Sequence, residues 1–467
     1  MGFDMKQKQI ERLIEIVGKE SVITEVEDRI TYSYDSTRLE YMPDVVVQAK
    51  SAEEISGILK FANQEGIPVT PRGTATGLSG GCLAVNGGIL LVIVHMNRIL
   101  DINPVDLLID VEAGIITEEV DRAASKYGLF YPPDPGSLKS STIGGNIAEN
   151  AGGLRGLKYG VTEDYVNGME VVLPTGEIVQ LGTRTVKGVT GYNLKSLMVG
   201  SEGTLGVITK ATLSLLPKPP ARASLLALFD KLTDAAQTVA DIVSEGVITS
   251  TMEIVDNVTI NAIEDYLKIG LDRNIGAMLL IEVDGHQGAV DVEAGIVKQV
   301  ATKNNALSCK LATSDKERDS LWTARRAALS SLARVKPSTI LEDATVPRSR
   351  IVELVEAVNA IAKKYDMRIG TFGHAGDGNL HPTLLTDLRV PEEEQKVEKV
   401  VQEIFEVTVS LGGTLSGEHG IGISKAKYLG LEISPEVFEL MKKVKRTFDP
   451  NNILNPGKMY FDQLAKR

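Results

Sequence analysis

The chain has 467 residues, of which 24% are charged and 43% hydrophobic, and its formal net charge is −12. Domains usually contain about 100–200 residues, so this length predicts two or three domains. An acidic chain lacks the basic face that nucleic acid requires, so no nucleic-acid partner is expected. The only cysteines, Cys82 and Cys309, lack C-x-x-C spacing and argue against both a disulfide framework and an iron–sulfur cluster. The longest apolar run, residues 89–94, is too short for a membrane span, so we expect a cytoplasmic protein.

The first half of the chain alternates between helix and strand signals. Apolar positions at helical spacing predict a helix over residues 6–17 that ends at Gly18. A capping box at residues 51–54 opens a second helix, which closes near Gly66. The remaining expected elements are a helix near 117–127 and strands at 45–47, 67–70, 89–94, 107–112, 168–173 and 204–215.

A proline-rich stretch at residues 216–220 is the clearest domain boundary. Beyond it, strand signals at 224–229, 250–255 and 277–283 alternate with helix signals at 232–245 and 288–303, and a last helix is expected at 435–447. This order predicts an α+β domain with helices on one face of an antiparallel sheet. We therefore divide the chain into an N-terminal helical segment (1–40), a glycine-rich domain (41–220), a substrate or cap domain (221–415) and a C-terminal segment (416–467).

Three glycine-rich loops lie within the first half of the chain. They occupy residues 71–81, 132–146 and 200–206. None matches a dinucleotide fingerprint or a P-loop, and a single loop of this kind could be no more than a tight turn. Small residues nevertheless let successive backbone N–H groups approach an anion. Three such loops together indicate a large phosphate-bearing cofactor, most simply a dinucleotide.

Two further glycine-rich motifs hold three of the five histidines. The first contains His374 and His381, which are seven residues apart with Gly376 and Gly378 between them; the second contains Glu418 and His419. The spacing predicts a bent strand or a strand and loop that turns both rings inward. Two imidazoles and one carboxylate suit Zn²⁺, Fe²⁺, Mn²⁺ or Co²⁺. The alternative is a set of hydrogen-bonded core histidines.

These motifs resemble those of a known family. The three loops resemble the flavin-binding segments of FAD-linked oxidases of the vanillyl-alcohol oxidase type, and the histidine motifs resemble the D-lactate, glycolate and D-2-hydroxyglutarate dehydrogenase branch. The match runs from about residue 40 to the end. It implies a two-subdomain FAD-binding domain, then an α+β substrate or cap domain with an antiparallel sheet, and a C-terminal segment that returns to the flavin.

The resemblance assigns three groups of residues to FAD. The pyrophosphate is held by the first loop, through Arg72, Gly73, Thr74, Thr76, Gly77, Leu78, Ser79, Gly80 and Gly81. The flavin is lined by Pro133, Asp134, Gly136, Ser140, Thr142, Gly145, Asn146, Ala151 and Gly152, and Asn455 reaches the isoalloxazine. The adenine half is met by Glu202, Gly203, Gly206 and Ile208. Many relatives tether FAD through a histidine in the first loop, whereas this loop has none, so noncovalent FAD is expected.

The resemblance also implies the chemistry. His374, His381 and Glu418 match the metal ligands of these dehydrogenases, and His419 matches their catalytic base. In this hypothesis a 2-hydroxy acid chelates the metal, His419 takes the hydroxyl proton, and the Cα hydride passes to flavin N5. Asn379 orients the substrate, and Arg325 binds its carboxylate.

Relatives that bind diacids carry a lysine just before the position of Asp343, where this chain has Leu341 and Glu342. A short substrate such as D-lactate is therefore expected, with glycolate or D-2-hydroxyglutarate as alternatives. An electron-transfer flavoprotein is the expected electron acceptor, as in the lactate dehydrogenase subunit of electron-confurcating complexes, with quinone as the alternative. Two other classes stay open at this point: a zinc hydrolase, and a flavin subunit without catalytic activity.

Overall fold

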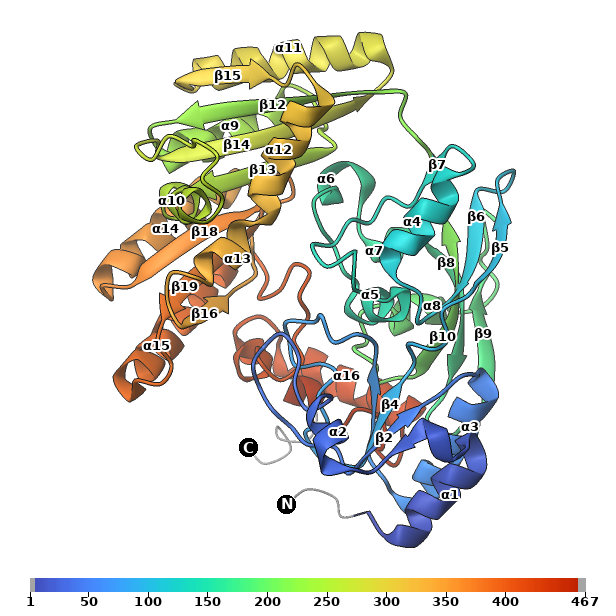
Figure 1. The fold of residues 1–467 in the computed structure, drawn as a ribbon. Coiled ribbons are helices and arrows are strands. Elements are labelled where there is room, and N and C mark those ends of the chain that lie inside the picture. The colour runs from blue at the N-terminus through green and yellow to red at the C-terminus, as the bar shows by residue number, and fades with distance from the viewer. Residues whose placement is uncertain (1–4, 461–467) are drawn as a thin grey trace. The chain divides into compact units, whose positions relative to one another are not determined.

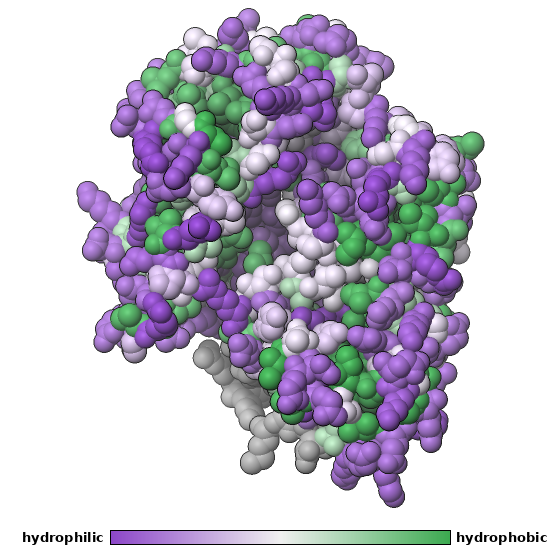
Figure 2. Space-filling view, viewed as in Figure 1, coloured by the Kyte–Doolittle hydropathy of each residue, from purple (hydrophilic) through white to green (hydrophobic). Residues whose placement is uncertain are grey.

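A computed structural model describes residues 5–460 and divides them into two compact units (Figure 1). The first unit contains the described residues up to Ala151, then Val161–Lys218, and the chain from Glu418 onward. The second unit contains Gly152–Gly160 and Pro219–Gly417. On the face drawn in Figure 2, hydrophilic side chains predominate, and apolar ones form scattered patches between them. No helix in the described part of the chain is both long and apolar enough to cross a membrane.

The first unit holds two main sheets. In the four-stranded sheet, β2 and β3 run parallel to β4, while β1 pairs antiparallel with β2. Its strands are β1 (Val22–Ile23), β2 (Val45–Gln48), β3 (Val69–Arg72) and β4 (Ile89–Val92). The second sheet is antiparallel, in the order β5 (Ile99–Asn103), β6 (Leu108–Glu112), β10 (Val207–Ser214), β8 (Val166–Val172) and β9 (Ile178–Gly182). A short ladder joins β7 (Leu129–Phe130) to β11 (Leu216–Pro217).

The first unit contains eight of the α-helices in the described residues. They are α1 (Gln7–Val17), α2 (Val26–Ile30), α3 (Ala52–Glu65), α4 (Thr117–Ser125), α5 (Ile143–Glu149), α7 (Thr162–Tyr165), α8 (Leu194–Met198) and α16 (Pro435–Phe448). The ends of α3 show how neighbouring residues start and stop a helix. At the start of α3, Ser51 accepts a hydrogen bond from the Glu54 amide at 3.2 Å, and Glu54 accepts one from the Lys50 amide. Gly66 ends α3 in the left-handed conformation. The predicted N-cap at Ser51 and the stop at Gly66 are therefore confirmed, whereas Glu54 bonds to the amide of Lys50 and not to that of Ser51, so the reciprocal half of the capping box is not formed.

The second unit is built on one antiparallel sheet. Its order is β15 (Ser308–Leu311), β12 (Ala221–Phe229), β14 (Ala277–Gly285), β13 (Thr251–Asp256), β18 (Arg368–His374), β19 (Asn379–Thr386) and β16 (Ser338–Leu341), and β17 (Ala344–Thr345) also pairs with β19. Its helices are α6 (Gly156–Tyr159), α9 (Leu232–Ser244), α10 (Asn257–Leu267), α11 (Gln287–Lys303), α12 (Asp315–Arg326), α13 (Ala328–Leu332), α14 (Ile351–Lys364) and α15 (Pro391–Ser410). The antiparallel sheet of the prediction is confirmed.

The prediction that helices cover only one face of this sheet is wrong. Helices α10, α12 and α13 pack their apolar residues against Val255 and Phe372 on one face. Helices α9, α11, α14 and α15 pack against one another and against the sheet on the other face. Every residue of β13 is consequently buried, including its acidic residues Glu253 and Asp256. A strand that is covered on both faces does not alternate between polar and apolar residues, so its sequence does not show whether one face is exposed to solvent.

Candidate active site

A β-hairpin brings the two histidines of the first motif to one face of the second unit's sheet. Strands β18 and β19 pair His374 with Asn379 and Phe372 with His381. Directly paired residues share a face, as do residues two apart along a strand, so His374, Asn379 and His381 lie on the same side. Gly378, with φ of +87°, forms the turn where an added Cβ would lie 2.1 Å from a backbone oxygen. The expected strand and loop is therefore a glycine-dependent hairpin.

The segment that leads to the second histidine motif is tied to the same sheet. The Thr414 amide donates to the Thr345 carbonyl at 2.9 Å, and the Ser416 hydroxyl donates to Asp343 Oδ2 at 2.7 Å. At Gly417 an added Cβ would lie only 2.2 Å from the Thr345 hydroxyl, so the close approach requires glycine. Glu418 and His419 are the next residues of this anchored segment.

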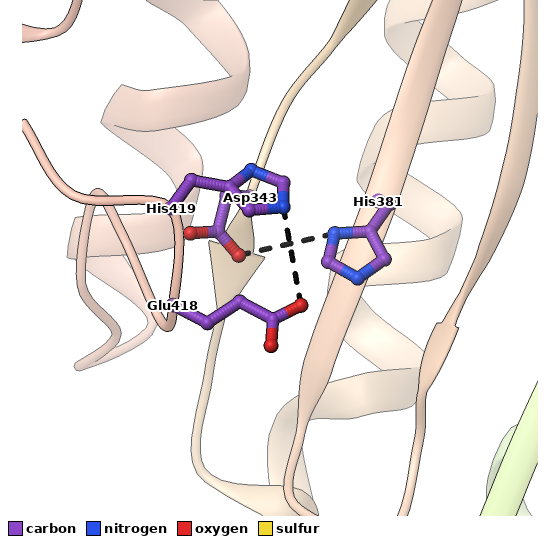
Figure 3. A group of neighbouring side chains, drawn as sticks. All are labelled: Asp343, His381, Glu418 and His419. Carbon is purple, nitrogen blue, oxygen red and sulfur yellow. Dashed lines mark ion pairs between the residues drawn. The ribbon is translucent and has the colours of Figure 1, made fainter. Parts of the chain in front are cut away.

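Four side chains form a compact group of potential metal ligands, drawn in Figure 3: Asp343, His381, Glu418 and His419. Each offers one ligand atom, and these atoms all lie within 4.8 Å of one another. Asp343 Oδ1 is 3.8 Å from His381 Nδ1, and Glu418 Oε1 is 3.9 Å from His419 Nε2. Two imidazoles and two carboxylates are a donor set that suits a divalent transition metal. The chemistry of these residues therefore fits the metal that the sequence led us to expect.

The other sequence-predicted residues of this site lie beside the group. The ring of His374 is 5.2 Å from that of His381, edge to face, although His374 is not one of the four clustered residues. Asn379 is buried, with its amide nitrogen 2.8 Å from the position a Cβ would take at Gly417. Arg325, buried in α12, lies over the ring of Phe372 at 4.8 Å.

Two carboxylates of this region were not among the predicted site residues. Asp343 joins the metal-binding group, and Glu253 contacts both His374 and Arg325. The sequence held a signal for Glu253, because an acidic residue inside the apolar run of β13 is unusual unless it is paired. Asp343 follows β16 and carries no comparable signal.

In the first unit, the first glycine-rich loop leaves consecutive backbone N–H groups unsatisfied among the described residues. None of the backbone N–H groups of residues 74–78 donates a hydrogen bond to another described residue. Consecutive unsatisfied N–H groups in a partly buried loop form an anion-binding surface. The Arg72 side chain is engaged elsewhere: it donates to the Tyr34 carbonyl at 2.8 Å and lies over the Tyr32 ring.

The C-terminal segment returns to this loop through Asn455. Its amide nitrogen donates to the carbonyls of Gly81 at 2.8 Å and Glu202 at 2.7 Å. Its Oδ1 is buried and has no hydrogen-bond partner among the described residues. A buried amide oxygen without a partner, next to a row of unsatisfied N–H groups, fits a polar cofactor such as FAD.

The second loop is joined to the first by a hydrogen bond, and the third is joined to the C-terminal segment. Thr74 donates to the Ser140 carbonyl at 2.6 Å, and Thr142 caps α5 by accepting from the Gly145 amide at 3.2 Å. Asn146 donates to Thr117, and the Glu202 carboxylate accepts from the amides of Ile421 and Gly422.

The remaining residues assigned to FAD have varied surroundings. Asp134 and Ser79 are buried, Ile208 lies in the hydrophobic core of the first unit, and Gly206 is pressed against Val171. An added Cβ would have 3.3 Å or more of room at Gly203 and would meet nothing within 4 Å at Gly136. Of the other residues assigned to FAD, Gly77 and Leu78 are partly buried and Pro133 is buried. The chain passes from the first unit to the second between Ala151 and Gly152.

Two buried carboxylates, Glu149 and Glu202, lie close to Gly81 at the end of the first loop. An added Cβ at Gly81 would be 2.7 Å from Glu149 and 3.8 Å from Glu202. Loss of hydration on burial raises the pKa of Glu149, and the neighbouring Glu202 raises it further. Burial likewise raises the pKa of Glu202, and it lowers the pKa of Lys458 to about 8. Sequence reasoning did not single out Glu149.

Glycine loops with free backbone N–H groups, together with a cluster of imidazoles and carboxylates, are features of a flavin-dependent oxidoreductase. Residues 43–182 match the FAD binding domain family, and residues 218–459 match the C-terminal domain of FAD linked oxidases. The chain belongs to the FAD-linked oxidases and carries their FAD-binding domain.

Two relatives narrow the comparison within this family. Over 458 residues the chain is 50% identical to the glycolate oxidase subunit GlcD of Bacillus subtilis, covering 98% of this chain and 97% of the relative. It is 36% identical to a D-lactate dehydrogenase of Anaerostipes hadrus, covering 97% of each. The chain is thus related to FAD-linked enzymes of glycolate and D-lactate type.

A solved structure confirms the fold. The chain superposes on p-cresol methylhydroxylase with a TM-score of 0.79 at 18% identity, covering 97% of this chain and 96% of that one. At this level of identity the likeness concerns the fold, which is of the vanillyl-alcohol oxidase type predicted from the glycine loops. An FAD-linked oxidase is not a zinc hydrolase, so that alternative loses its support.

Proposed function

We propose that this protein oxidises a short D-2-hydroxy monocarboxylate, D-lactate to pyruvate in the first instance, with FAD as the immediate acceptor. The observation that carries the proposal is the group of imidazoles and carboxylates around His381, with a buried arginine that packs on the Phe372 ring of the same hairpin, in a chain with an FAD-binding domain. Glycolate is the second candidate, because a relative of 50% identity is named a glycolate oxidase subunit.

The residues proposed to hold the metal are His374, His381 and Glu418, with Asp343 as an additional oxygen donor from the same group. When bound, a divalent cation such as Zn²⁺, Fe²⁺, Mn²⁺ or Co²⁺ lowers the pKa of a hydroxyl, and FAD accepts a hydride. The burial of Asp343 and His381 favours ligation over hydration of these side chains.

The chain's own residues bind the substrate and move its proton. His419 accepts the hydroxyl proton at Nε2, the ring nitrogen that faces Glu418. Arg325 binds the substrate carboxylate through its planar guanidinium, whose orientation is set by Phe372 and Glu253. Asn379 orients the hydroxyl or the carboxylate. Leu341 and Glu342 offer no positive charge for a second carboxylate, which favours monocarboxylates over diacids.

FAD is proposed to bind noncovalently, with its pyrophosphate on the N–H groups of the first loop and its flavin near Asn455. In domain terms, residues 41–220 bind FAD, residues 221–415 bind substrate, and residues 416–467 complete both sites. The proposed electron acceptor is an electron-transfer flavoprotein, with quinone as the alternative. The two unpaired cysteines support a reducing, cytoplasmic location.

The test is visible absorption of the purified protein under anaerobic conditions, before and after addition of D-lactate, L-lactate or glycolate. Oxidised FAD absorbs at about 450 nm and bleaches on reduction. Bleaching by D-lactate but not by L-lactate supports the proposal, and faster bleaching by glycolate would favour the second candidate. A yellow protein that none of these acids reduces would contradict it.

A further inference from the structure

A fully buried glutamate, Glu253, connects two residues that the proposed function uses for different purposes. It lies in the middle of β13, and its side chain has no exposed surface. The antiparallel register pairs Glu253 directly with His374 on β18, which puts the two side chains on the same face of the sheet. Glu253 is 121 residues away from His374 in the chain and belongs to neither histidine motif.

One oxygen of Glu253 determines which nitrogen of His374 carries the proton. Glu253 Oε1 lies 2.7 Å from His374 Nδ1. An ionised carboxylate only accepts hydrogen bonds, so Nδ1 is the protonated nitrogen and the lone pair of a neutral ring is on Nε2. This pairing is the arrangement by which carboxylates orient metal-binding histidines in proteins. The contact therefore prepares His374 to bind a metal through Nε2.

The other oxygen of Glu253 holds Arg325. Glu253 Oε2 accepts from Arg325 Nε at 2.7 Å and lies 2.5 Å from Nη2, while the guanidinium covers the ring of Phe372. This contact uses two of the five N–H groups of the guanidinium. The charges of Glu253 and Arg325 compensate each other in a place where neither is hydrated. The arginine is thus fixed in orientation before any substrate arrives.

We propose that Glu253 is a positioning residue that sets the metal-binding nitrogen of His374 with one oxygen and the substrate-binding guanidinium of Arg325 with the other. The inference rests on the proposed function for the roles of His374 and Arg325. It adds that a single buried carboxylate links metal affinity to substrate affinity. Substitution of Glu253 therefore weakens both, and it does so through His374 and Arg325.

The experiment compares Glu253→Gln with the matched control Glu282→Gln in the FAD-containing protein. Glu282 lies on the adjacent strand β14, on the same face, and bonds to Ser224 and Trp322 instead of a histidine or arginine. The affinity of metal-depleted protein for Zn²⁺ is measured by competition with a chelator, without substrate. We expect Glu253→Gln to weaken Zn²⁺ binding by about 10–100-fold, the usual cost of losing such a partner, and Glu282→Gln to change it by less than about threefold.

The second readout is steady-state kinetics with D-lactate at saturating Zn²⁺. Here Glu253→Gln is expected to raise KM by about 10-fold or more, a larger factor than its loss in kcat, because a misoriented guanidinium mainly loses substrate binding. Should Glu253→Gln not fold, Glu253→Asp is used: it keeps the charge that compensates Arg325 but is shorter by one methylene, and the same weakening of Zn²⁺ binding is expected.

The outcomes separate the two proposals. Unchanged Zn²⁺ affinity in a folded, FAD-containing Glu253 variant overturns the inference even if D-lactate reduces the flavin. The reverse result, weakened Zn²⁺ binding in a protein that no 2-hydroxy acid reduces, supports the role at His374 and contradicts the proposed function. Equal losses in the Glu253 and Glu282 variants would show a general effect of altering the buried sheet, and would also overturn the inference.

Discussion

The histidine motifs form their candidate site from side chains, whereas the first glycine-rich loop forms its candidate site mainly from backbone. In the second unit, His374, His381 and Arg325 each contact a carboxylate, and the regular strands β18 and β19 and helix α12 determine their positions. In the first unit, the first glycine-rich loop has unsatisfied N–H groups at residues 74–78, its Gly81 carbonyl accepts from Asn455, and glycines permit its close contacts. The difference predicts opposite sensitivities to mutation: loss of a side chain should harm one site, and gain of a side chain should harm the other.

The largest expected effect is at His419. Substitution His419→Ala removes the proposed proton acceptor and should reduce kcat for D-lactate by about 10²–10⁴-fold, the usual contribution of a general base. FAD content should not change, because no FAD contact is assigned to this side chain. His286→Ala is the control, since His286 is exposed at the start of α11. Stopped-flow flavin reduction measures both, and a His419→Ala protein reduced at the normal rate would refute the assignment.

Adding a methyl group, in contrast to removing a side chain, tests the candidate site of the first glycine-rich loop. At Gly73 an added Cβ would lie 2.4 Å from Thr142 Oγ1, the atom that caps α5. Gly73→Ala should therefore cost about 1–3 kcal/mol in the free energy of unfolding, as overpacking usually does, and should weaken FAD binding.

The matched control for this methyl group is Gly136→Ala. Both glycines are assigned to FAD and neither has a positive φ, but at Gly136 an added Cβ meets no atom within 4 Å. Urea unfolding and FAD titration compare the two variants. Equal effects would mean that crowding against Thr142 is not what makes glycine necessary at position 73.

The buried carboxylates behind the first loop predict a pH dependence. The pKa values of Glu149 and Glu202 are raised in the folded protein, so the folded state holds more protons than the unfolded state above about pH 4.5. Their contribution to stability is present at lower pH and is lost as pH rises through the raised pKa values. Glu149→Gln, which keeps a neutral group, should therefore gain stability relative to the unmodified protein between pH 5 and pH 8.

Thermal unfolding at pH 5 and at pH 8 measures this gain. A gain of about 1 kcal/mol in the free energy of unfolding would raise Tm by roughly 1–3 °C in a unit of this size. The control is Glu177→Gln, because Glu177 is exposed and its pKa is lowered by a hydrogen bond from Thr175. That variant should show no gain at pH 8. A Glu149→Gln protein whose stability follows pH as the unmodified protein does would mean that Glu149 carries its charge in the fold.

The smallest effect is expected for loss of a side chain from the first loop. Thr76 is half-buried, and its side chain makes no hydrogen bond with another described residue. Thr76→Ala should change FAD affinity by less than about threefold, since substitutions outside packed or bonded positions usually cost less than about 0.5 kcal/mol. A loss of 10-fold or more in FAD titration would show that side chains, and not only the backbone, bind the cofactor.

Several local features of the fold could be predicted from neighbouring residues alone. The cap at Ser51, the end of α3 at Gly66 and the helix over residues 7–17 depend on hydrogen bonds within a few residues. The histidine hairpin is similar, because His374 and Asn379 are separated only by a tight turn. Such short-range geometry is a direct consequence of residue type and spacing.

The sequence by itself determined the family motifs, several of the strands and helices, and the residue types available for metal and cofactor binding. The tertiary structure alone decided which residues join them: Glu253 reaches His374 from 121 residues away, and Asp343 reaches Ser416 from 73 residues away. It also decided that helices cover both faces of the second unit's sheet. The physical reason is that strand register and burial arise from packing between distant segments. Packing removes water from a carboxylate such as Glu253, and a buried carboxylate is costly unless a hydrogen-bond or ion-pair partner replaces that water.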